Sequence, residues 1–282
     1  MFSRFSYTLS LMSSSWQVLK KDKELLVFPL LSGICCALVT ASFVLPMLGT
    51  GAWAPPAEGA ATVEYVVYYG ILFLFYFCNY FVITFFNSAI IACAVARLHG
   101  MNPSVGTGLR AAFSRIHLII GWALFSATVG LVLRIIEDRS KAVGRIMAGL
   151  LGAAWSIVTF LAVPVLVVEN AGPIEAFKRS ARMLKDTWGE QLIGNFGFGL
   201  VFFVLAIPAF IIGGIGVAMG TPASLAAGIA LAVVYLIILG LVQTALQAIF
   251  QAALYLYARG DGEPEGFQGG VLAAAARQRS EG

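Results

Sequence analysis

Charged residues are scarce in this 282-residue chain: Asp, Glu, Lys and Arg together make up 11% of it, whereas hydrophobic residues make up 60%. Soluble domains carry about 25% charged and about 45–50% apolar residues. The mean hydropathy of +0.89 points the same way. This balance excludes an ordinary soluble enzyme domain, a disordered chain, a coiled coil and a collagen, and it predicts a multi-span membrane protein.

Catalytic and metal-binding motifs are also missing from the sequence. It contains no HExxH or GxSxG pattern, and its four cysteines show no CxxC or Cys/His spacing. No charged residue lies in the middle of an apolar run, where buried carboxylates usually mark the ion-coupling sites of transporters. We therefore expect neither an enzyme nor an ion-coupled pump, and we expect no cofactor and no metal.

Long apolar runs dominate what is present. A spanning helix needs about 20 mostly apolar residues, and six runs meet that length: Leu25–Leu48, Val63–Ala96, His117–Ile136, Ile146–Val168, Gln191–Met219 and Ser224–Tyr257. The second and the sixth exceed it, so they are expected to tilt or to project beyond the bilayer.

The distribution of Lys and Arg predicts the orientation. With the N-terminus in the cytoplasm, the inner segments hold 14 of the 18 positive residues, and the outer segments hold Arg134, Arg139, Lys141 and Arg145. Positive residues concentrate on the cytoplasmic side, so both termini are predicted there. The four outer residues form one basic loop that departs from this pattern. The net charge of +4 then indicates anionic lipid headgroups at the cytoplasmic face, and no nucleic acid.

Amphipathic segments precede the spans. Apolar residues recur at steps of three and four along Phe2, Phe5, Leu9, Met12, Trp16 and Leu19, along Ile174, Phe177, Ala181, Leu184 and Trp188 after Pro173, and more weakly along Val105, Leu109, Ala112, Phe113 and Ile116. Such helices, with basic residues beside the apolar stripe, typically lie in the membrane interface. We expect anchors there at Trp16, Lys20, Arg179, Lys185 and Trp188.

The segment that begins at Phe2 and the segment that follows Pro173 also align with each other. Ser15-x-x-x-Leu19-Lys20 matches Ser180-x-x-x-Leu184-Lys185. The predicted fold is therefore an all-α polytopic membrane bundle of six transmembrane helices in three hairpins, each preceded by an interfacial amphipathic helix. Its single membrane domain, residues 1–260, divides into units 1–100, 101–171 and 172–260, and residues 261–282 are expected to form a mobile cytoplasmic tail.

The segment from Pro164 to Lys185, with Glu169-Asn170-Ala-Gly172-Pro173 at its centre, resembles a recurring stretch in bacterial multi-pass families. These include the glycerophosphodiester-phosphodiesterase membrane-domain-like and Yip1-like groups. The opening Ser15-Trp16-x-x-Leu-Lys-Lys-Asp22 resembles an uncharacterised family of the same kind. The resemblance implies a six-span protein of the bacterial inner membrane. It carries no active residues, and no phosphodiesterase domain is appended.

Side-chain amides inside the spans are the most informative polar residues. Asn79 and Asn87 lie eight apart in the second run, and Gln243, Gln247 and Gln251 lie at steps of four in the sixth. Residues at these spacings share one helix face. Since hydrocarbon cannot satisfy an amide, these faces are expected to point into the bundle. They either hydrogen-bond between helices or line a polar path or lipid-headgroup pocket.

Two classes of function remain open at this point. The first is passive permeation or lipid handling through a polar-lined bundle. The second is a structural or accessory protein that organises the inner leaflet or docks partners on its amphipathic helices. Membrane lipids are the expected partners in both, with a homo-oligomer as a further alternative. A water-accessible cavity lined by the five amides favours the first class, and a dry, fully paired bundle favours the second.

Overall fold

The computed structural model describes residues 2–48, 56, 59–139, 143–187, 197–262, 264, 266 and 267, and it describes only the backbone of 2–8, 139, 187, 197, 198 and 200. Every regular element in these ranges is a helix, which confirms the predicted all-α class. The helices are α1 (Phe2–Lys21), the short 3₁₀ helix η1 (Lys23–Leu26), α2 (Val27–Leu48), α3 (Thr62–Leu98), α4 (Val105–Ser114), α5 (Ile116–Arg139), α6 (Val143–Val158), α7 (Ala162–Val168), α8 (Pro173–Thr187), α10 (Gly197–Ala218) and α11 (Pro222–Arg259).

Six helical stretches are long and apolar enough to cross a membrane: η1 with α2, α3, α5, α6 with α7, α10, and α11. They coincide with the six predicted runs, and they fit a multi-pass membrane protein. Helix α2 packs against α3, α5 against α6, and α10 against α11, while α3 also packs along α5 and α11. The predicted tail falls almost wholly outside the described residues.

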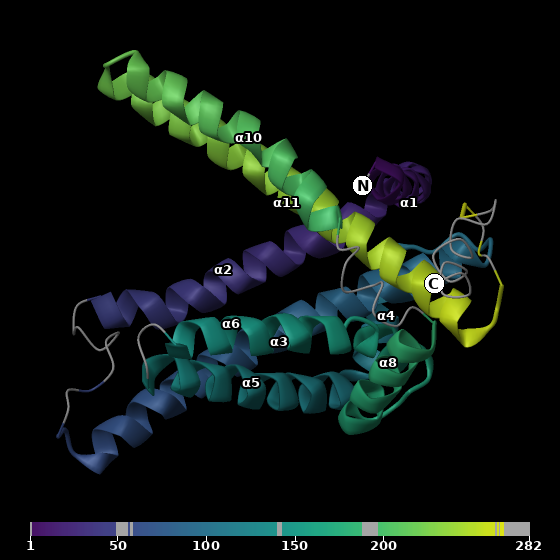
Figure 1. Ribbon diagram of the computed structural model, residues 1–282, viewed down its shortest axis with the longest axis horizontal. Helices are drawn as coiled ribbons and strands as arrows, with labels where there is room; N and C mark the ends of the chain where they lie inside the picture. The colour runs from purple at the N-terminus through teal and green to yellow at the C-terminus, as the bar shows by residue number, and fades with distance from the viewer. Residues whose placement is uncertain are drawn as a thin grey trace.

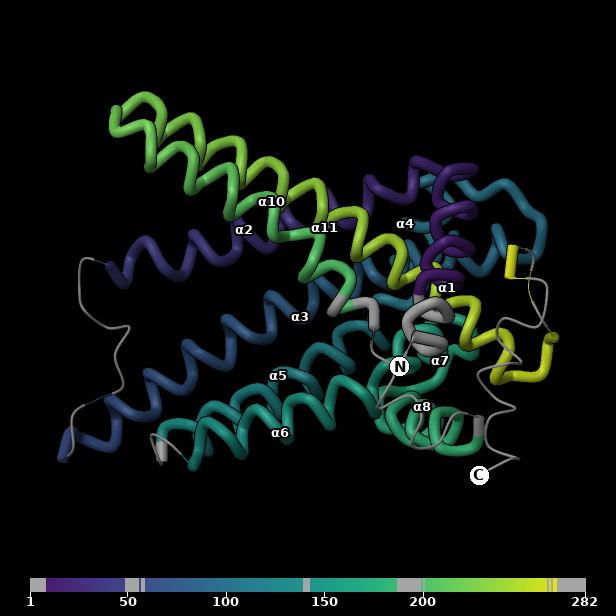
Figure 2. Tube along the Cα trace, turned by 45° about the horizontal axis from the view of Figure 1, so that its top comes forward, coloured from purple at the N-terminus to yellow at the C-terminus, as the bar shows by residue number. Residues whose placement is uncertain are grey.

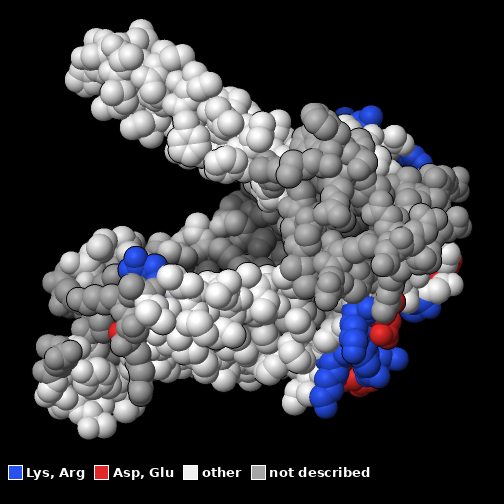
Figure 3. Space-filling model, in the orientation of Figure 1, with Lys and Arg blue, Asp and Glu red and all other residues white. Residues whose placement is uncertain are grey.

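The helices converge at one end of the molecule and diverge at the other (Figures 1 and 2). We call the converging end the basic end; it comprises α1, α4, α7, α8 and the C-terminal halves of α3 and α11. Lysines and arginines gather there over α8 in Figure 3. From this end the α10–α11 hairpin runs out separately from α3, α5 and α6. Figure 3 shows an open V between that hairpin and the other spans.

Burial follows the same division. The largest fully buried side chains cluster at the basic end and include Phe28, Ile90, Leu166, Ile249 and Tyr255. By contrast, the diverging α10–α11 hairpin exposes large apolar side chains on all sides, among them Phe203, Phe210, Ile215, Leu231 and Ile237. Lipid tails are the natural neighbours of such surfaces. The protein therefore has one tightly packed end and a set of spans that meet lipid over most of their length.

The fourth predicted span is not continuous, which corrects the reading of Ile146–Val168 as one helix. The helix stops at Val158 and restarts at Ala162. Pro164 has no N–H to donate to the Phe160 carbonyl one turn earlier, and its ring crowds that carbonyl, which weakens the helical ladder at the break. The Ser180 hydroxyl of α8 satisfies the interrupted backbone: it accepts the Leu161 N–H at 3.0 Å and donates to the Val158 carbonyl at 2.6 Å. A distant serine thus replaces two bonds of the ladder.

The amphipathic segments are helical as predicted, and α8 begins at Pro173. Their protein-facing sides differ from the predicted stripes, however. In α1 the buried residues are Leu11, Ser15, Val18 and Leu19, whereas Leu9 and Trp16 of the stripe are 42% and 44% exposed. In α8 the buried residues are Ala176, Ser180 and Leu184, whereas Ile174 is exposed. Small residues let these helices pack closely on the bundle and leave part of each stripe exposed.

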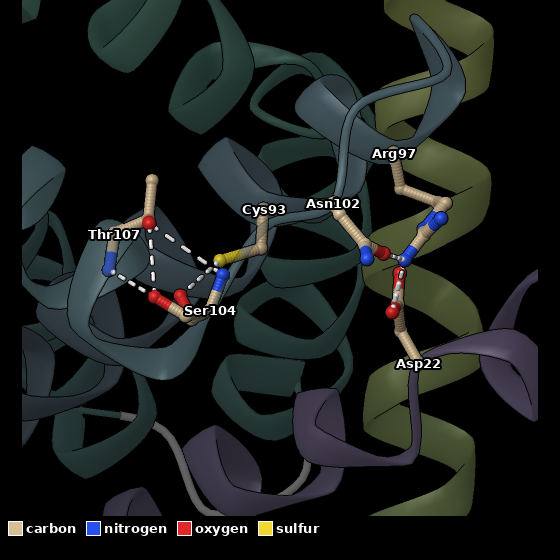
Figure 4. Close-up of polar contacts among 6 residues, drawn as sticks. All are labelled: Asp22, Cys93, Arg97, Asn102, Ser104 and Thr107. Carbon is tan, nitrogen blue, oxygen red and sulfur yellow. Dashed lines mark hydrogen bonds and ion pairs between the residues drawn. The ribbon is translucent and has the colours of Figure 1, made fainter.

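Ionic contacts tie the basic end together. Figure 4 shows the Arg97 guanidinium, at the end of α3, bonded to the Asp22 carboxylate between α1 and η1 and to the Asn102 amide oxygen. The Ser104 and Thr107 side chains in the same figure form a capping box that starts α4. These contacts therefore fix the end of α1 to the end of α3.

A second ionic contact links three more helices. Glu169, at the end of α7, pairs with Arg179 of α8. Its other carboxylate oxygen accepts the Tyr255 hydroxyl of α11 at 3.0 Å. Charged groups at this depth are stabilising only when they are paired, so the contact holds α7, α8 and α11 in one arrangement.

Candidate functional site: an amide-lined cavity

A cavity of about 160 Å³ lies where α2, α3 and α11 meet. Helix α2 contributes its first turns, α3 its central part and α11 its third quarter. The lining residues are Pro29, Ser32, Ile83, Phe86, Asn87, Ile90, Thr244, Gln247, Ala248 and Gln251. A water molecule takes up about 30 Å³ in the liquid, so the cavity has room for a few waters or one small polar group.

Three of the five predicted amides line this cavity: Asn87 from α3, and Gln247 and Gln251 from α11. Gln251 is 9% exposed, and the other two are half-buried. Within the part of the chain that the structure describes, none of these three amides hydrogen-bonds to another residue. Each amide offers two N–H donors and one carbonyl acceptor. The cavity thus presents unused donors and acceptors from two helices without any net charge.

The other two predicted amides lie elsewhere. The Asn79 side chain donates to the Phe75 carbonyl of its own helix at 3.0 Å and does not line the cavity. Gln243 is half-buried and is also absent from the lining. Helices α3 and α11 diverge toward their other ends, so the eight-residue step that separates Asn79 from Asn87 leads to different surroundings.

Sequence reasoning missed Ser32 and Thr244. Ser32 is one of three hydroxyl residues in its span, with Thr40 and Ser42, and no spacing singles it out. Thr244, in contrast, stands three and seven residues before Gln247 and Gln251, which is the spacing of one helix face. Its hydroxyl donates to the Gly240 carbonyl at 2.9 Å, as an intrahelical threonine commonly does.

Of the five predicted interface anchors, the four that the structure describes lie at the basic end. Trp16 and Lys20 are exposed on α1, and Lys185 is exposed on α8. Arg179 is 45% exposed and pairs with Glu169. Trp188 lies outside the described residues. Over the described ranges, no group of three or more His, Cys, Asp or Glu residues is placed to hold a metal ion.

The depth of the cavity follows from helix geometry. At 1.5 Å per residue, Asn87 lies about 16 Å before the end of α3, Gln251 about 12 Å before the end of α11, and Ser32 about 8 Å after the start of α2. The cavity therefore sits one to three turns inside the basic end, near the level where the α10–α11 hairpin separates from α3.

Fold and site together describe a helical multi-pass membrane protein with an uncharged polar cavity between three spans. A comparison with protein-family models matches residues 66–266, more than two thirds of the chain, to a family of unknown function, DUF6159, and the chain belongs to that family. The match includes Asn87, Gln247 and Gln251, while α1, η1 and α2 precede it. Comparisons with curated proteins and with solved structures gave no match. The resemblance to the phosphodiesterase membrane-domain-like and Yip1-like groups finds no support in these comparisons.

Proposed function

We propose that the protein handles membrane lipids by binding the polar part of a phospholipid in the amide-lined cavity. The observation that carries this proposal is the set of three side-chain amides, Asn87, Gln247 and Gln251, that face one cavity without a partner in the described chain. Their polar atoms are not enclosed by protein, since none of them is among the fully buried side-chain atoms without a partner. They are therefore open to a ligand that supplies both acceptors and donors, and each hydrogen bond to such a group is worth about 0.5–1.5 kcal/mol.

The position of the cavity suits the glycerol-ester region of a lipid. Helix α11 separates from α3 beyond it, and the diverging halves of these spans expose apolar side chains that suit acyl chains. Ester carbonyls would accept from the amide N–H groups, and a headgroup hydroxyl would donate to the amide oxygens. Because Asn and Gln are neutral, the site favours such polar groups over a bare ion.

Passive permeation is less well supported than binding. On the basic-end side of the cavity, the next turns of α3 and α11 place Ile91, Ala94, Leu254 and Tyr255 in the buried core. The described side chains therefore give no continuous polar lining toward that end. Lipid binding needs only the cavity itself and access from the bilayer between the diverging helices.

The test compares matched amide variants. Purified wild type, Asn87→Leu and Gln251→Leu are incorporated into nanodiscs that contain a phospholipid with a photoreactive acyl chain. After illumination, intact-protein mass spectrometry quantifies the cross-linked adduct. We expect several-fold less adduct in both variants. Asn79→Leu, which changes an amide of the same helix outside the cavity, is expected to retain wild-type labelling. Equal labelling of all four proteins would refute the proposal.

We further propose that the protein lies in the bacterial inner membrane with its basic end in the cytoplasm and with three units of one interfacial helix and one hairpin. The basic residues of α1 and α8 support this orientation, since they gather at one end. Exposed Leu9 and Trp16 on α1 support interfacial contact with lipid. Ser15 and Ser180, which the sequence aligns, are both fully buried, and this shared position supports the repeat.

The alternative function is a structural or accessory role, in which α1 and α8 dock partners or organise the leaflet. The exposed apolar face of α1 favours it. In that case the cavity amides would hold only water, and the photoreactive lipid would label wild type and variants alike. The nanodisc experiment therefore separates the two classes.

A further inference from the structure

A second group of polar residues lies at the far end of the bundle, where α5 leads into α6. A cavity of about 400 Å³ there is lined by Tyr76 and Tyr80 of α3, Arg134 and Glu137 of α5, and Arg145 and Gly149 of α6, among others. These residues include two of the four positive residues that the orientation rule does not explain. None of them belongs to the amide-lined cavity, so the two sites can be tested independently.

Glu137 holds both arginines on this cavity. One of its oxygens lies 3.2 Å from Arg134 Nη1, and the other lies 3.8 Å from Arg145 Nε. The Arg134 Nη2 atom is 3.3 Å from Asp138 Oδ1. A guanidinium has five N–H donors, so these contacts leave donors on both arginines. The side chain of Arg145 is 76% exposed, and its fork is therefore accessible to a ligand.

The charge of this region favours an anion. Along residues 134–145 the sequence carries Arg134, Arg139, Lys141 and Arg145 against Glu137 and Asp138. Arginine is the residue best suited to phosphate, because its planar fork makes two parallel hydrogen bonds to two phosphate oxygens. The Tyr76 and Tyr80 rings, whose centroids are 6.4 Å apart, form the opposite wall of the cavity.

Arg134 also lines a neighbouring cavity of about 150 Å³ between α2 and α3, together with Phe43, Ile71, Leu72 and Phe75. This second cavity is largely apolar. An arginine between a charged cavity and an apolar one is placed to bind the part of a lipid where the headgroup meets the acyl chains. Tyrosines are typical of that level of the membrane.

We propose that this far-end site binds the phosphate group of a phospholipid, with an acyl chain in the adjoining apolar cavity. Arg134 and Arg145 contact the phosphate oxygens, and Glu137 acts as a positioning residue that holds the two guanidinium groups at one cavity. The ligand belongs to the leaflet opposite the basic end. This assignment also gives the basic loop a role: its positive charges serve ligand binding.

The experiment titrates the detergent-solubilised protein with dihexanoylphosphatidylglycerol, dihexanoylglycerol and inorganic phosphate, and follows binding by calorimetry. We expect the phospholipid to bind at least tenfold more tightly than either fragment, because only it fills both cavities. Arg145→Gln should weaken phospholipid binding about tenfold, the usual scale for one charge-assisted contact. Equal affinity of inorganic phosphate and the phospholipid would overturn the lipid assignment and leave a site for free phosphate.

A cavity-filling variant tests the site without changing its charge. A Cβ atom built at Gly149 meets nothing within 4 Å, and the same holds for Gly214 of α10. The titrations are made in the Asn87→Leu background, which removes lipid binding at the amide-lined cavity, so that the remaining binding reports on the far-end site alone. Gly149→Leu should abolish this remaining phospholipid binding, whereas the same substitution at Gly214 should leave it unchanged. Wild-type binding by Arg145→Gln and Gly149→Leu would overturn the proposal.

Discussion

Replacing Ser180 by alanine tests how the break between α6 and α7 is held. The Ser180 hydroxyl accepts the Leu161 N–H at 3.0 Å and donates to the Val158 carbonyl at 2.6 Å. The helix offers neither group a ready substitute: the Ala162 N–H that would serve the Val158 carbonyl donates to Thr159, and the Ile157 carbonyl that would serve the Leu161 N–H accepts from Phe160. Alanine at 180 would therefore leave one donor and one acceptor unpaired.

The expected loss of stability follows from burial. Leu161 and Ser180 are both 0% exposed, so water cannot replace the hydroxyl without a local opening. An unpaired buried backbone group costs about 1–3 kcal/mol, and two groups give an expected loss of about 2–6 kcal/mol. Hydrogen bonds measured inside membranes average lower, about 0.6 kcal/mol each, which places the lower bound of the loss near 1 kcal/mol.

The assay is reversible unfolding in mixed micelles of dodecyl maltoside and increasing dodecyl sulfate, followed by tryptophan fluorescence. Trp155 reports on this region, since it stacks on Phe177 of α8 with ring centroids 5.6 Å apart. Ser15→Ala is the matched control: Ser15 is equally buried, but its hydroxyl donates only to Leu11 of its own helix at 3.0 Å. That bond duplicates a helical one, so its loss should cost a few tenths of a kcal/mol. Equal losses in the two variants would refute the assigned role of Ser180.

Three further predictions concern packing and topology. Gly108→Ala should destabilise the protein by about 1–3 kcal/mol, because the added Cβ would lie 2.7 Å from atoms of α2 and α3. Gly106→Ala, whose Cβ would have no contact closer than 3.7 Å, should be neutral in the same unfolding assay. Gly228→Val should separate α10 from α11, because its Cβ would lie 2.9 Å from Gly216 Cα; disulfide cross-linking of cysteine pairs across the hairpin should then fall. Alkaline phosphatase fused to the C-terminus should be inactive if that terminus is cytoplasmic, and activity there would reverse the proposed orientation.

The six spans could be predicted because a long apolar run has only one stable form in a bilayer, a helix that satisfies its own backbone. The break at residues 159–161 could not, even though Thr159 and Pro164 mark it. An apolar run can break its helix only where another group satisfies the backbone N–H and carbonyl groups at the break. Here that group is the hydroxyl of Ser180, which lies on another helix. Local sequence carries no record of such a distant contact.

The faces of α1 and α8 show a second limit of sequence reasoning. Periodicity identifies an apolar stripe, but lipid and protein are equally apolar partners for it. The structure turns Leu11 and Ser15 toward the bundle and leaves Trp16 outside. Small side chains decided this, because they permit close approach of two helices. A pattern that scores hydrophobicity gives serine and alanine little weight, so it marks the stripe that is expected in the membrane interface and leaves the bundle-facing side unmarked.

The amides were predicted in part for a related reason. Helical spacing correctly groups Gln247 with Gln251 on one face, and it also groups Asn79 with Asn87. Of the two asparagines, Asn87 alone lines the cavity. Two residues on one face of a helix share a neighbouring helix only as far as the two helices run side by side. The angle between α3 and α11 is a property of tertiary packing and is absent from either helix alone.

That angle also explains why the cavity lies where it does. In a bilayer no hydrophobic force drives helices together, so close packing needs small residues, hydrogen bonds or ion pairs. At the basic end, Asp22 with Arg97 and Glu169 with Arg179 supply such contacts. Beyond them α11 has no such contact with α3, and the two helices separate. The unpaired amides stand at this transition, where the neighbouring volume passes from protein to lipid. Polar groups at such a boundary are best satisfied by a molecule that is itself polar at one end and apolar at the other.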